Sequence, residues 1–276
     1  LSKRLQEEGG GSVYLAGATD RGKTTLCRYL QEELSQFGTL AWIDCDSGQA
    51  SLGPPTTIGC AMVPGGMRWL RFIGSTSPPG HLLPFLTGAA RLKEVAQHAG
   101  AAYLVIDSPG YVEDGTAQEF QIQLIDLLQP DHLVAIQRVG EIEPILSPFR
   151  ESRRMQVHRF EPVSAVRRRS QEERRRYREG RFREYFQGAE TQEISLIGVA
   201  VHGRVPSSFR QEAWRDLLVA FLDGERWVLA LGIVQALDLP SSRMQVLASP
   251  LEQEEVASIR VGSMRWNPEL GCEGPA

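Results

Sequence analysis

A glycine-rich loop between an apolar segment and an amphipathic segment constrains this chain of 276 residues more than any other feature. Residues 17–24 read GATDRGKT and match the pattern G-x-x-x-x-G-K-[ST]. The segment before the loop, 12–16, is apolar and strand-like, and the segment 26–37 after it has helical spacing. In that context, successive backbone N–H groups and the positive end of the helix dipole bind phosphate. The loop therefore predicts a site for a nucleoside triphosphate.

Nine consecutive residues are expected to form this nucleotide site. Lys23 would reach the β and γ phosphates, and the Thr24 hydroxyl would ligate Mg²⁺. The nine residues are Gly17, Ala18, Thr19, Asp20, Arg21, Gly22, Lys23, Thr24 and Thr25.

Strand-like and helix-like segments alternate through the first half of the chain. Strands are expected at 39–43, 68–73, 102–106 and 132–137, with helices at 83–99 and 118–128 between them, and the Gly- and Pro-rich stretch 53–66 is expected to be a connection. This alternation is typical of an α/β fold. We therefore predict a P-loop NTPase core with a mostly parallel, doubly wound sheet.

The second half of the chain changes in charge and then in pattern. Residues 150–183 hold 13 arginines and 5 glutamates, a net charge of +8, so the remaining residues carry −12 of the total of −4. One cationic segment on an acidic body indicates a local contact with a polyanion. We expect 164–187 to form a pair of basic helices broken near Gly180, acting as a lid on a P-loop domain over 1–192. Short alternating runs after it predict a small β-rich domain over 193–276.

The composition argues against a membrane-bound or secreted protein. No apolar run approaches the ~20 residues that cross a membrane, the N-terminal residues lack the apolar core of a signal peptide, and the four cysteines show no C-x-x-C spacing. We therefore expect a cytoplasmic protein without a membrane partner, a disulfide framework or a zinc site.

Acidic residues follow two of the expected strands. Asp44 and Asp46 lie in DCDSGQ after the second strand, and Asp107 lies in DSPG after 102–106. Ligands bind at the carboxyl ends of strands in open α/β sheets. A carboxylate there can ligate Mg²⁺ or accept a proton from an attacking hydroxyl. These positions indicate nucleotide hydrolysis or phosphoryl transfer, and they leave the acceptor open.

Several motifs in order resemble the polynucleotide 5′-hydroxyl kinase family, which includes the kinase subunit of the pre-mRNA cleavage factor and nucleolar kinases of ribosomal RNA processing. They are GATDRGKTT, DCDSGQASLGPP, GSTSPPGH, DSPGYV, the Pro130–Asp131 pair and RRRSQEERRRYREGRFREYF. The resemblance implies a kinase that uses ATP and Mg²⁺ to phosphorylate the 5′-hydroxyl end of RNA, and of DNA as a further substrate class.

The resemblance also implies roles for individual residues. Lys23, Asp46, Arg174 and Arg178 would be catalytic, with Asp46 as general base and the two arginines as an R-x-x-x-R pair on one face of the lid. Thr24 and Asp46 would hold the metal. Gln49, Thr76, Tyr111 and Arg169 would bind the nucleic acid, with Tyr111 stacking on the terminal base.

Two other function classes remain open at this point. One is a P-loop NTPase switch of the metallochaperone or partition type, which would use Asp107 and give the arginine lid no task. The other is an ATP-bound scaffold in RNA processing. The preference for RNA or DNA, and for ATP or GTP, stays open as well.

Overall fold

The computed structural model describes residues 1–164, 166–268 and 270–275. Within these residues, seven strands form a first sheet in the order β4-β3-β2-β5-β1-β6-β7. The five strands from β2 to β7 in that order pair in parallel, whereas β3 and β4 add as antiparallel strands at one edge. The strands are β1 (Gly11–Ala16), β2 (Leu40–Asp44), β3 (Thr57–Val63), β4 (Arg68–Phe72), β5 (Tyr103–Asp107), β6 (His132–Ile136) and β7 (Gln156–Phe160).

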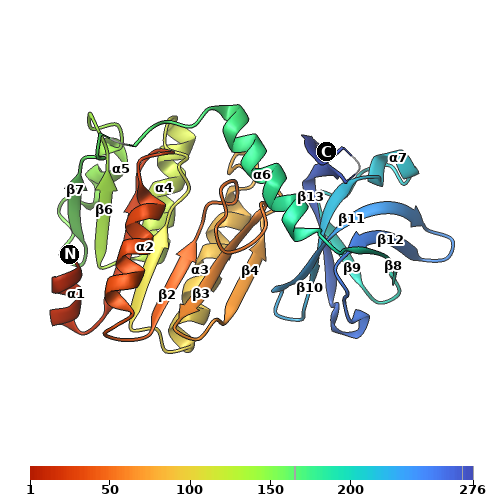
Figure 1. Ribbon diagram of the computed structural model, residues 1–276, viewed down its shortest axis with the longest axis horizontal. Helices are drawn as coiled ribbons and strands as arrows, with labels where there is room; N and C mark the ends of the chain where they lie inside the picture. The colour runs from red at the N-terminus through yellow and green to blue at the C-terminus, as the bar shows by residue number, and fades with distance from the viewer. Residues whose placement is uncertain (165, 269, 276) are drawn as a thin grey trace.

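Helices cover both faces of the first sheet (Figure 1). On one face α1 (Ser2–Glu8) and α2 (Lys23–Leu34) bury their apolar side chains against β1, β2 and β5. On the other face α3 (Leu82–His98), α4 (Gly115–Leu128) and the short α5 (Glu143–Leu146) and η1 (Ser147–Phe149) complete a second core layer. The predicted mostly parallel α/β sheet with helices on both sides is confirmed.

Two strands of the first sheet were not predicted: β7 (Gln156–Phe160), in a stretch that was assigned no strand from the sequence, and β3. The Gly- and Pro-rich stretch 53–66, expected as a connection, contains β3, whose residues are almost all buried. Turn residues flank this strand at both ends, at Pro54 and Pro55 and at Pro64 to Gly66, and they mask its short apolar run.

A second sheet follows the lid. Within the described residues, β14, β13, β10, β11, β12 and β8 are neighbours in that order and antiparallel, and β9 adds in parallel to β13. The elements are β8 (Glu190–Ser195), β9 (Ala200–Gly203), α7 (Gln211–Trp214), β10 (Leu217–Leu222), β11 (Val228–Asp238), β12 (Arg243–Ala248), η2 (Gln253–Glu255), β13 (Ser258–Asn267) and β14 (Cys272–Pro275). The predicted β-rich C-terminal part is thus a real sheet, and its first strand begins at Glu190.

The lid is one helix, not the expected pair. α6 (Gln171–Tyr185) runs through Gly180 without interruption and lies between the two sheets (Figure 1). Ser170 and Glu173 form a capping box at its start, and pairs such as Arg175 with Glu179 support its exposed face. A single glycine costs a helix only about 1 kcal/mol, and these interactions offset it.

The second half of α6 is buried in the C-terminal sheet. The Phe182 side chain is fully buried, and its ring centroid lies 4.9 Å from that of Trp266. Phe186 packs in the same cluster, and the Tyr185 hydroxyl accepts a hydrogen bond from the Leu231 N–H at 2.9 Å. The second half of the helix therefore packs against the C-terminal sheet, and its first half reaches the P-loop. No helix among the described residues is long and apolar enough to cross a membrane.

The continuity of α6 can be tested with one substitution. A Cβ added at Gly180 would meet no atom within 4 Å, and the backbone there is not left-handed, so Gly180→Ala should raise the free energy of unfolding by about 0.5–1 kcal/mol. Gly188, with φ of 78°, is the matched control, because Gly188→Ala should destabilise the protein. Urea unfolding measures both. Destabilisation by Gly180→Ala would support a helix broken at that residue.

Candidate active site

The P-loop leads directly into α2. Gly22 is the N-cap of the helix with φ of 93°, a left-handed conformation that favours glycine. Lys23 is buried, and its Nζ donates hydrogen bonds to the Gly17 carbonyl at 2.8 Å and the Ala18 carbonyl at 3.1 Å. The ammonium group therefore lies over the loop whose N–H groups form the phosphate cradle.

Register brings the acidic strand ends together. Asp44, at the end of β2, pairs with Asp107, at the end of β5, and Asp107 pairs with Leu15 of β1 just before the P-loop. Both carboxyl groups are buried. Burial and the proximity of the other carboxylate raise the pKa of Asp44, and burial raises the pKa of Asp107 as well.

Asp44 and Asp46 divide their tasks. Asp44 Oδ1 accepts from the Asp46 N–H at 3.0 Å and Oδ2 accepts from the Ser51 N–H at 2.6 Å, so this carboxylate organises the loop after β2. Asp46 Oδ1 accepts from the N–H groups of Gly48 and Gln49 at 3.0 and 2.9 Å. No hydrogen bond within the described residues engages Asp46 Oδ2. Oδ1 of Asp46 is thus fixed by the loop, and Oδ2 is available to bind a ligand or accept a proton.

Thr24 and Asp107 form a candidate metal position. Thr24 Oγ1 donates to Asp107 Oδ2 at 2.6 Å, while Asp107 Oδ1 is buried and has no hydrogen-bond partner in the described structure. Mg²⁺ is usually bound through one or two carboxylates and the substrate phosphates, with several retained waters. The hydroxyl and the orphaned carboxylate oxygen fit that mode of binding. No group of three His, Cys, Asp or Glu side chains in the described part of the chain could hold a metal alone.

Two adjoining cavities meet at Asp46. The first, about 320 Å³, is lined by the P-loop from Thr19 to Thr25 and by Asp107. The second, about 540 Å³, is lined by the loops after β4 and β5 and by α6. Four residues line both cavities: Thr19 and Arg21 of the P-loop, and Asp46 and Gln49 of the loop after β2. The loop after β2 and the P-loop therefore form the boundary between a phosphate site and a second site.

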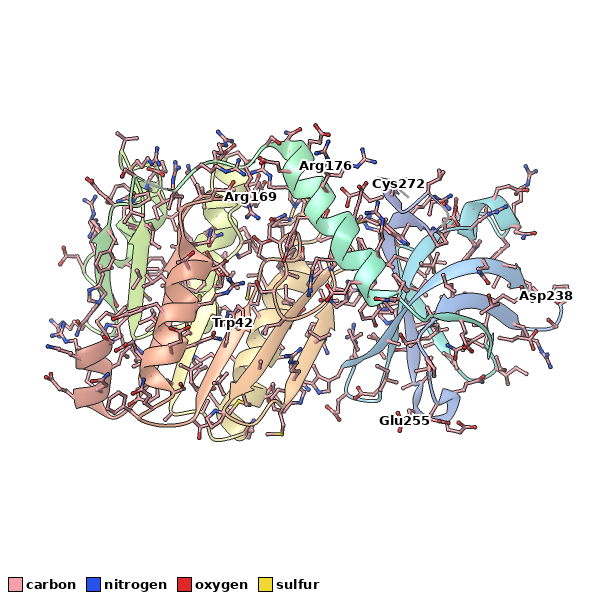
Figure 2. The ribbon with its side chains drawn as sticks, in the orientation of Figure 1. Trp42, Arg169, Arg176, Asp238, Glu255 and Cys272 are labelled. Atoms are coloured by element: carbon pink, nitrogen blue, oxygen red, sulfur yellow. The ribbon has the colours of Figure 1, made fainter. Side chains whose placement is uncertain are left out.

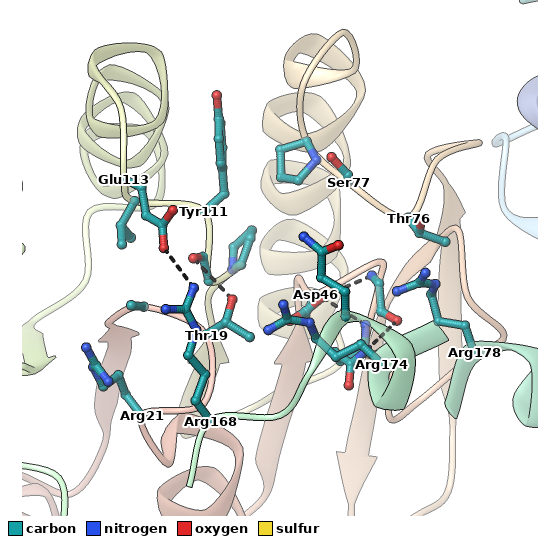
Figure 3. Close-up of a pocket in the computed structure, with 18 of the residues that line it drawn as sticks. Thr19, Arg21, Asp46, Thr76, Ser77, Tyr111, Glu113, Arg168, Arg174 and Arg178 are labelled. Atoms are coloured by element: carbon teal, nitrogen blue, oxygen red, sulfur yellow. Dashed lines mark hydrogen bonds and ion pairs between the residues drawn. The ribbon is translucent and has the colours of Figure 1, made fainter. Parts of the chain in front are cut away.

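The second cavity collects residues from distant parts of the sequence. Thr76 and Ser77 lie on one side and Tyr111 on the other, with Arg174 and Arg178 reaching in from α6 (Figure 3). The Tyr111 hydroxyl donates to the Asp114 carboxylate at 3.0 Å, which fixes the ring at the rim of the cavity.

Close packing of two loops shapes this cavity. A Cβ on Gly48 would lie 2.5 Å from the Thr76 carbonyl oxygen, so the loop after β2 must have a glycine there. The spacing of the glycine in DxDxGQ thus has a steric reason, which is the approach of the Thr76 loop to Asp46.

The start of the lid is bound to the P-loop through Asp20. The Asp20 side chain is only 4% exposed and accepts from the Arg169 N–H and Nε at 2.9 and 2.8 Å. Arg174 Nη1 lies 3.5 Å from the same carboxylate. Arg169 lines the phosphate cavity and is absent from the lining of the second cavity, which holds Gln49, Thr76 and Tyr111.

Arg178 is bound to the C-terminal sheet. It lines the second cavity, and its Nε donates to Glu273 of β14 at 2.9 Å, in a pair whose side chains are 18% and 12% exposed. Figure 2 shows Arg169 near the start of α6 and Cys272, the residue before Glu273, on the side of the C-terminal sheet. Sequence reasoning missed Glu273 and the role of Asp20. The P-loop pattern leaves the fourth position unspecified, and nothing in the sequence links two residues 95 positions apart.

Fold and site together define a P-loop phosphate-binding protein of the α/β class, with a second site beside the phosphates. The family model described as "mRNA cleavage and polyadenylation factor CLP1 P-loop" matches residues 17–188, and the chain belongs to this family. The resemblance found in the sequence motifs is thereby confirmed.

Named relatives extend the comparison. The chain is 27% identical to the polyribonucleotide 5′-hydroxyl-kinase of Pyrococcus furiosus, over 92% of this chain and 87% of that protein. It is 24% identical to the enzyme of the same name from Methanocaldococcus jannaschii, over 90% and 84%. The solved structure of a Clp1p–Pcf11p complex aligns with a TM-score of 0.73 at 13% identity, covering 95% of this chain and 76% of that one. This last similarity shows the fold.

Binding of the lid to Asp20 generates a prediction. Asp20→Asn removes the charge that Arg169 and Arg174 share, a loss of about 1.5–3 kcal/mol for hydrogen bonds to a charged group. Trypsin should then cleave after the arginines at 167–169 at least about 10-fold faster in the ligand-free protein, because cleavage follows the population of the open segment.

Glu113→Gln is the control for this experiment. Glu113 pairs with Arg168 at 3.6 Å, but both side chains are more than 70% exposed, so its loss should leave the cleavage rate almost unchanged. Equal cleavage of Asp20→Asn and the parent protein would show that Asp20 does not hold the lid.

Proposed function

We propose that this protein is an ATP-dependent polynucleotide 5′-hydroxyl kinase that transfers the γ-phosphate of ATP to the 5′-OH end of RNA. The observation that carries the proposal is the position of Asp46 on the boundary of two cavities, one lined mainly by the P-loop and one lined mainly by residues outside it, such as Thr76, Tyr111 and Arg174. A phosphoryl group can pass between donor and acceptor at such a boundary. The names of the archaeal relatives support RNA as the substrate class.

On the donor side, residues 17–25 bind the phosphates of ATP. Lys23 moves from the loop carbonyls to the β and γ phosphates. Thr24 and Asp46 would hold Mg²⁺ together with Asp107, whose Oδ2 accepts from Thr24 and whose Oδ1 has no hydrogen-bond partner in the described structure. When bound, the metal neutralises charge on the β and γ phosphates.

An apolar cavity next to the phosphate site suits the base of ATP. It is about 490 Å³ in volume and lies beside the first turn of α2, where Thr25 and Tyr29 face the segment after β7. Phe160, the last residue of β7, and Val163, in the segment after it, supply apolar surface against which a nucleobase can stack.

Asp46 acts on the acceptor as general base. Its Oδ1 is fixed by two backbone N–H groups. Its Oδ2 accepts the proton of the 5′-hydroxyl as the hydroxyl oxygen attacks the γ-phosphorus of ATP, the bond from that phosphorus to the bridging oxygen breaks and ADP leaves. Gln49 and Thr76 position the terminal nucleotide, and Tyr111 stacks on its base.

The lid arginines stabilise the phosphoryl group during its transfer. Arg174 and Arg178 project from one face of α6 into the second cavity, which we call the acceptor cavity. Their planar charged groups match the equatorial oxygens of the phosphoryl group in transfer. Arg169 lines the phosphate cavity, and in this proposal it binds a phosphate group of the nucleic acid from that side. In this proposal residues 1–192 form the kinase domain, and residues 193–276 form a β-rich domain that carries the lid.

A transfer assay tests the proposal. Parent protein, γ-labelled ATP and Mg²⁺ should label 5′-hydroxyl RNA, and a matched DNA oligonucleotide measures the sugar preference. Asp46→Asn should lower kcat by about 10²–10⁴-fold, since it removes the base but keeps an acceptor for the loop N–H groups. Arg174→Ala should lower kcat by about 10³-fold or more.

Arg176→Ala is the matched control within the lid. Arg176 lies on the same helix but is 73% exposed and pairs with Glu172, so its loss should leave kcat near the parental value. Release of free phosphate without labelled RNA would favour an NTPase switch. Tight ATP binding with neither product would favour a scaffold.

A further inference from the structure

A second group of cations lies outside the lid, where the two sheets meet. β4 is the edge strand of the first sheet that faces the second (Figure 1). Arg71 of β4, His81 at the start of α3, and four residues of the C-terminal part gather at this junction. We call them the junction cluster: Arg71, His81, His202, Arg204, Arg226 and Arg260.

Direct contacts join the members of the junction cluster. Arg71 Nη1 donates to the carbonyls of Glu225 and Arg226 at 3.2 and 2.7 Å. His202 of β9 is the register partner of Arg260 of β13. The cluster is thus built from strands and turns that are distant in sequence and fixed by the fold.

Few acidic partners neutralise these cations. No hydrogen bond or ion pair engages the side chain of Arg226 or Arg260 within the described residues, although Arg260 is partly buried. Of the nearby acids, Asp223 accepts from the Trp227 N–H, and Glu225 pairs with Arg91. The Arg71 guanidinium lies over the Trp227 ring, 5.3 Å from the ring centroid. This cation–π contact stabilises the charge of Arg71 without an anion.

Burial and the excess of positive charge lower the pKa values of members of the junction cluster. Burial, and then the repulsion of Arg226, Arg91 and Arg260, lowers the pKa of Arg71 to about 10. Burial and neighbouring arginines also lower the pKa of Arg260, and those of His81 and His202. Like charges held together in this way are stabilised when an anion is bound between them.

The junction cluster continues directly from the acceptor cavity. Pro78 lines that cavity, and two residues further on the Gly80 carbonyl accepts from Arg204 Nη2 at 2.8 Å. The next residue, His81, shares a 2.7 Å hydrogen bond between its Nε2 and Ser263 Oγ of β13. One short loop therefore has the acceptor end on one side and the cluster on the other.

From this continuity we infer that the junction cluster binds the phosphate backbone of the acceptor polynucleotide beyond its 5′-terminal nucleotides. The inference rests on the proposed kinase function, since the acceptor end fixes where the backbone leaves the cavity. The contacts are to phosphates, so they add affinity for longer strands without reading their sequence. This gives the C-terminal domain a share of the substrate site.

Substrate length separates this surface from the active site. The test compares a 5′-hydroxyl RNA dinucleotide with a single-stranded RNA of about 12 nucleotides, on the parent protein and on the double variant Arg226→Ala/Arg260→Ala. The KM for the longer strand should rise about 10-fold, and the slope of log affinity against log salt should fall by about 1.4, or about 0.7 for each lost phosphate contact. The dinucleotide does not reach the cluster, so its KM should stay within about twofold, which also reports that the variant is folded.

The control removes two arginines elsewhere in the same domain. Arg210→Ala/Arg243→Ala makes the same change in net charge at exposed positions, and both substrates should behave as with the parent protein. An unchanged KM for the long strand, an equal rise for both substrates, or the same effect in the control would overturn the inference.

Direct binding distinguishes failure of this inference from failure of the kinase proposal. If the parent protein labels neither substrate, the kinase proposal fails. Fluorescence anisotropy with the longer RNA labelled at its 3′ end then decides the question of the cluster. Weaker binding by the Arg226/Arg260 double variant alone would support the surface, and equal binding by all three proteins would reject it.

Discussion

Burial of Phe182 against Trp266 is the interaction on which the arrangement of this site depends. It fixes one half of α6 in the C-terminal sheet, while Asp20 binds the residues at the other end to the P-loop. A helix held at both ends has little freedom to place its arginines elsewhere. Arg174 and Arg178 therefore face the second cavity because of contacts made with two different sheets. The C-terminal domain thereby determines the geometry of the lid arginines.

Sequence predicts this fold best where one physical requirement dominates. The P-loop needs a strand before it and a helix after it, and buried parallel strands appear as short apolar runs, so the core of the first sheet was predicted closely. β3 was missed because an antiparallel edge addition needs only a short apolar run between two turns, which in a sequence looks like a connection. Gly180 misled in the opposite direction, since its small cost to the helix is offset by a capping box and buried aromatic residues far along the chain.

The candidate site shows the same division. The P-loop pattern and the family resemblance identified residues that line the two cavities, among them Lys23, Asp46, Gln49, Thr76 and Tyr111. They lie together because each follows a strand that ends at the same edge of the sheet. Partners that hold the lid side chains were beyond reach. Glu273 is joined to Arg178 only by the path of the second sheet, and Asp20 occupies a position that the P-loop pattern leaves free. Roles that depend on the backbone pattern are local in sequence, and roles that depend on ion pairing are not.

Charge distribution in space differs from charge distribution along the chain. The sequence concentrates 13 arginines near the lid, but many of them have acidic partners: Arg175 and Arg176 pair within the helix, Arg169 with Asp20, and Arg178 with Glu273. The junction cluster contains fewer arginines, widely scattered along the chain, and none of its four arginines forms an ion pair with an acidic side chain in the described structure. Unpaired charge, not the number of arginines, sets the field that a polyanion meets. In the proposed kinase, the lid is therefore suited to one phosphoryl group, and the junction cluster is the better surface for a chain of phosphates.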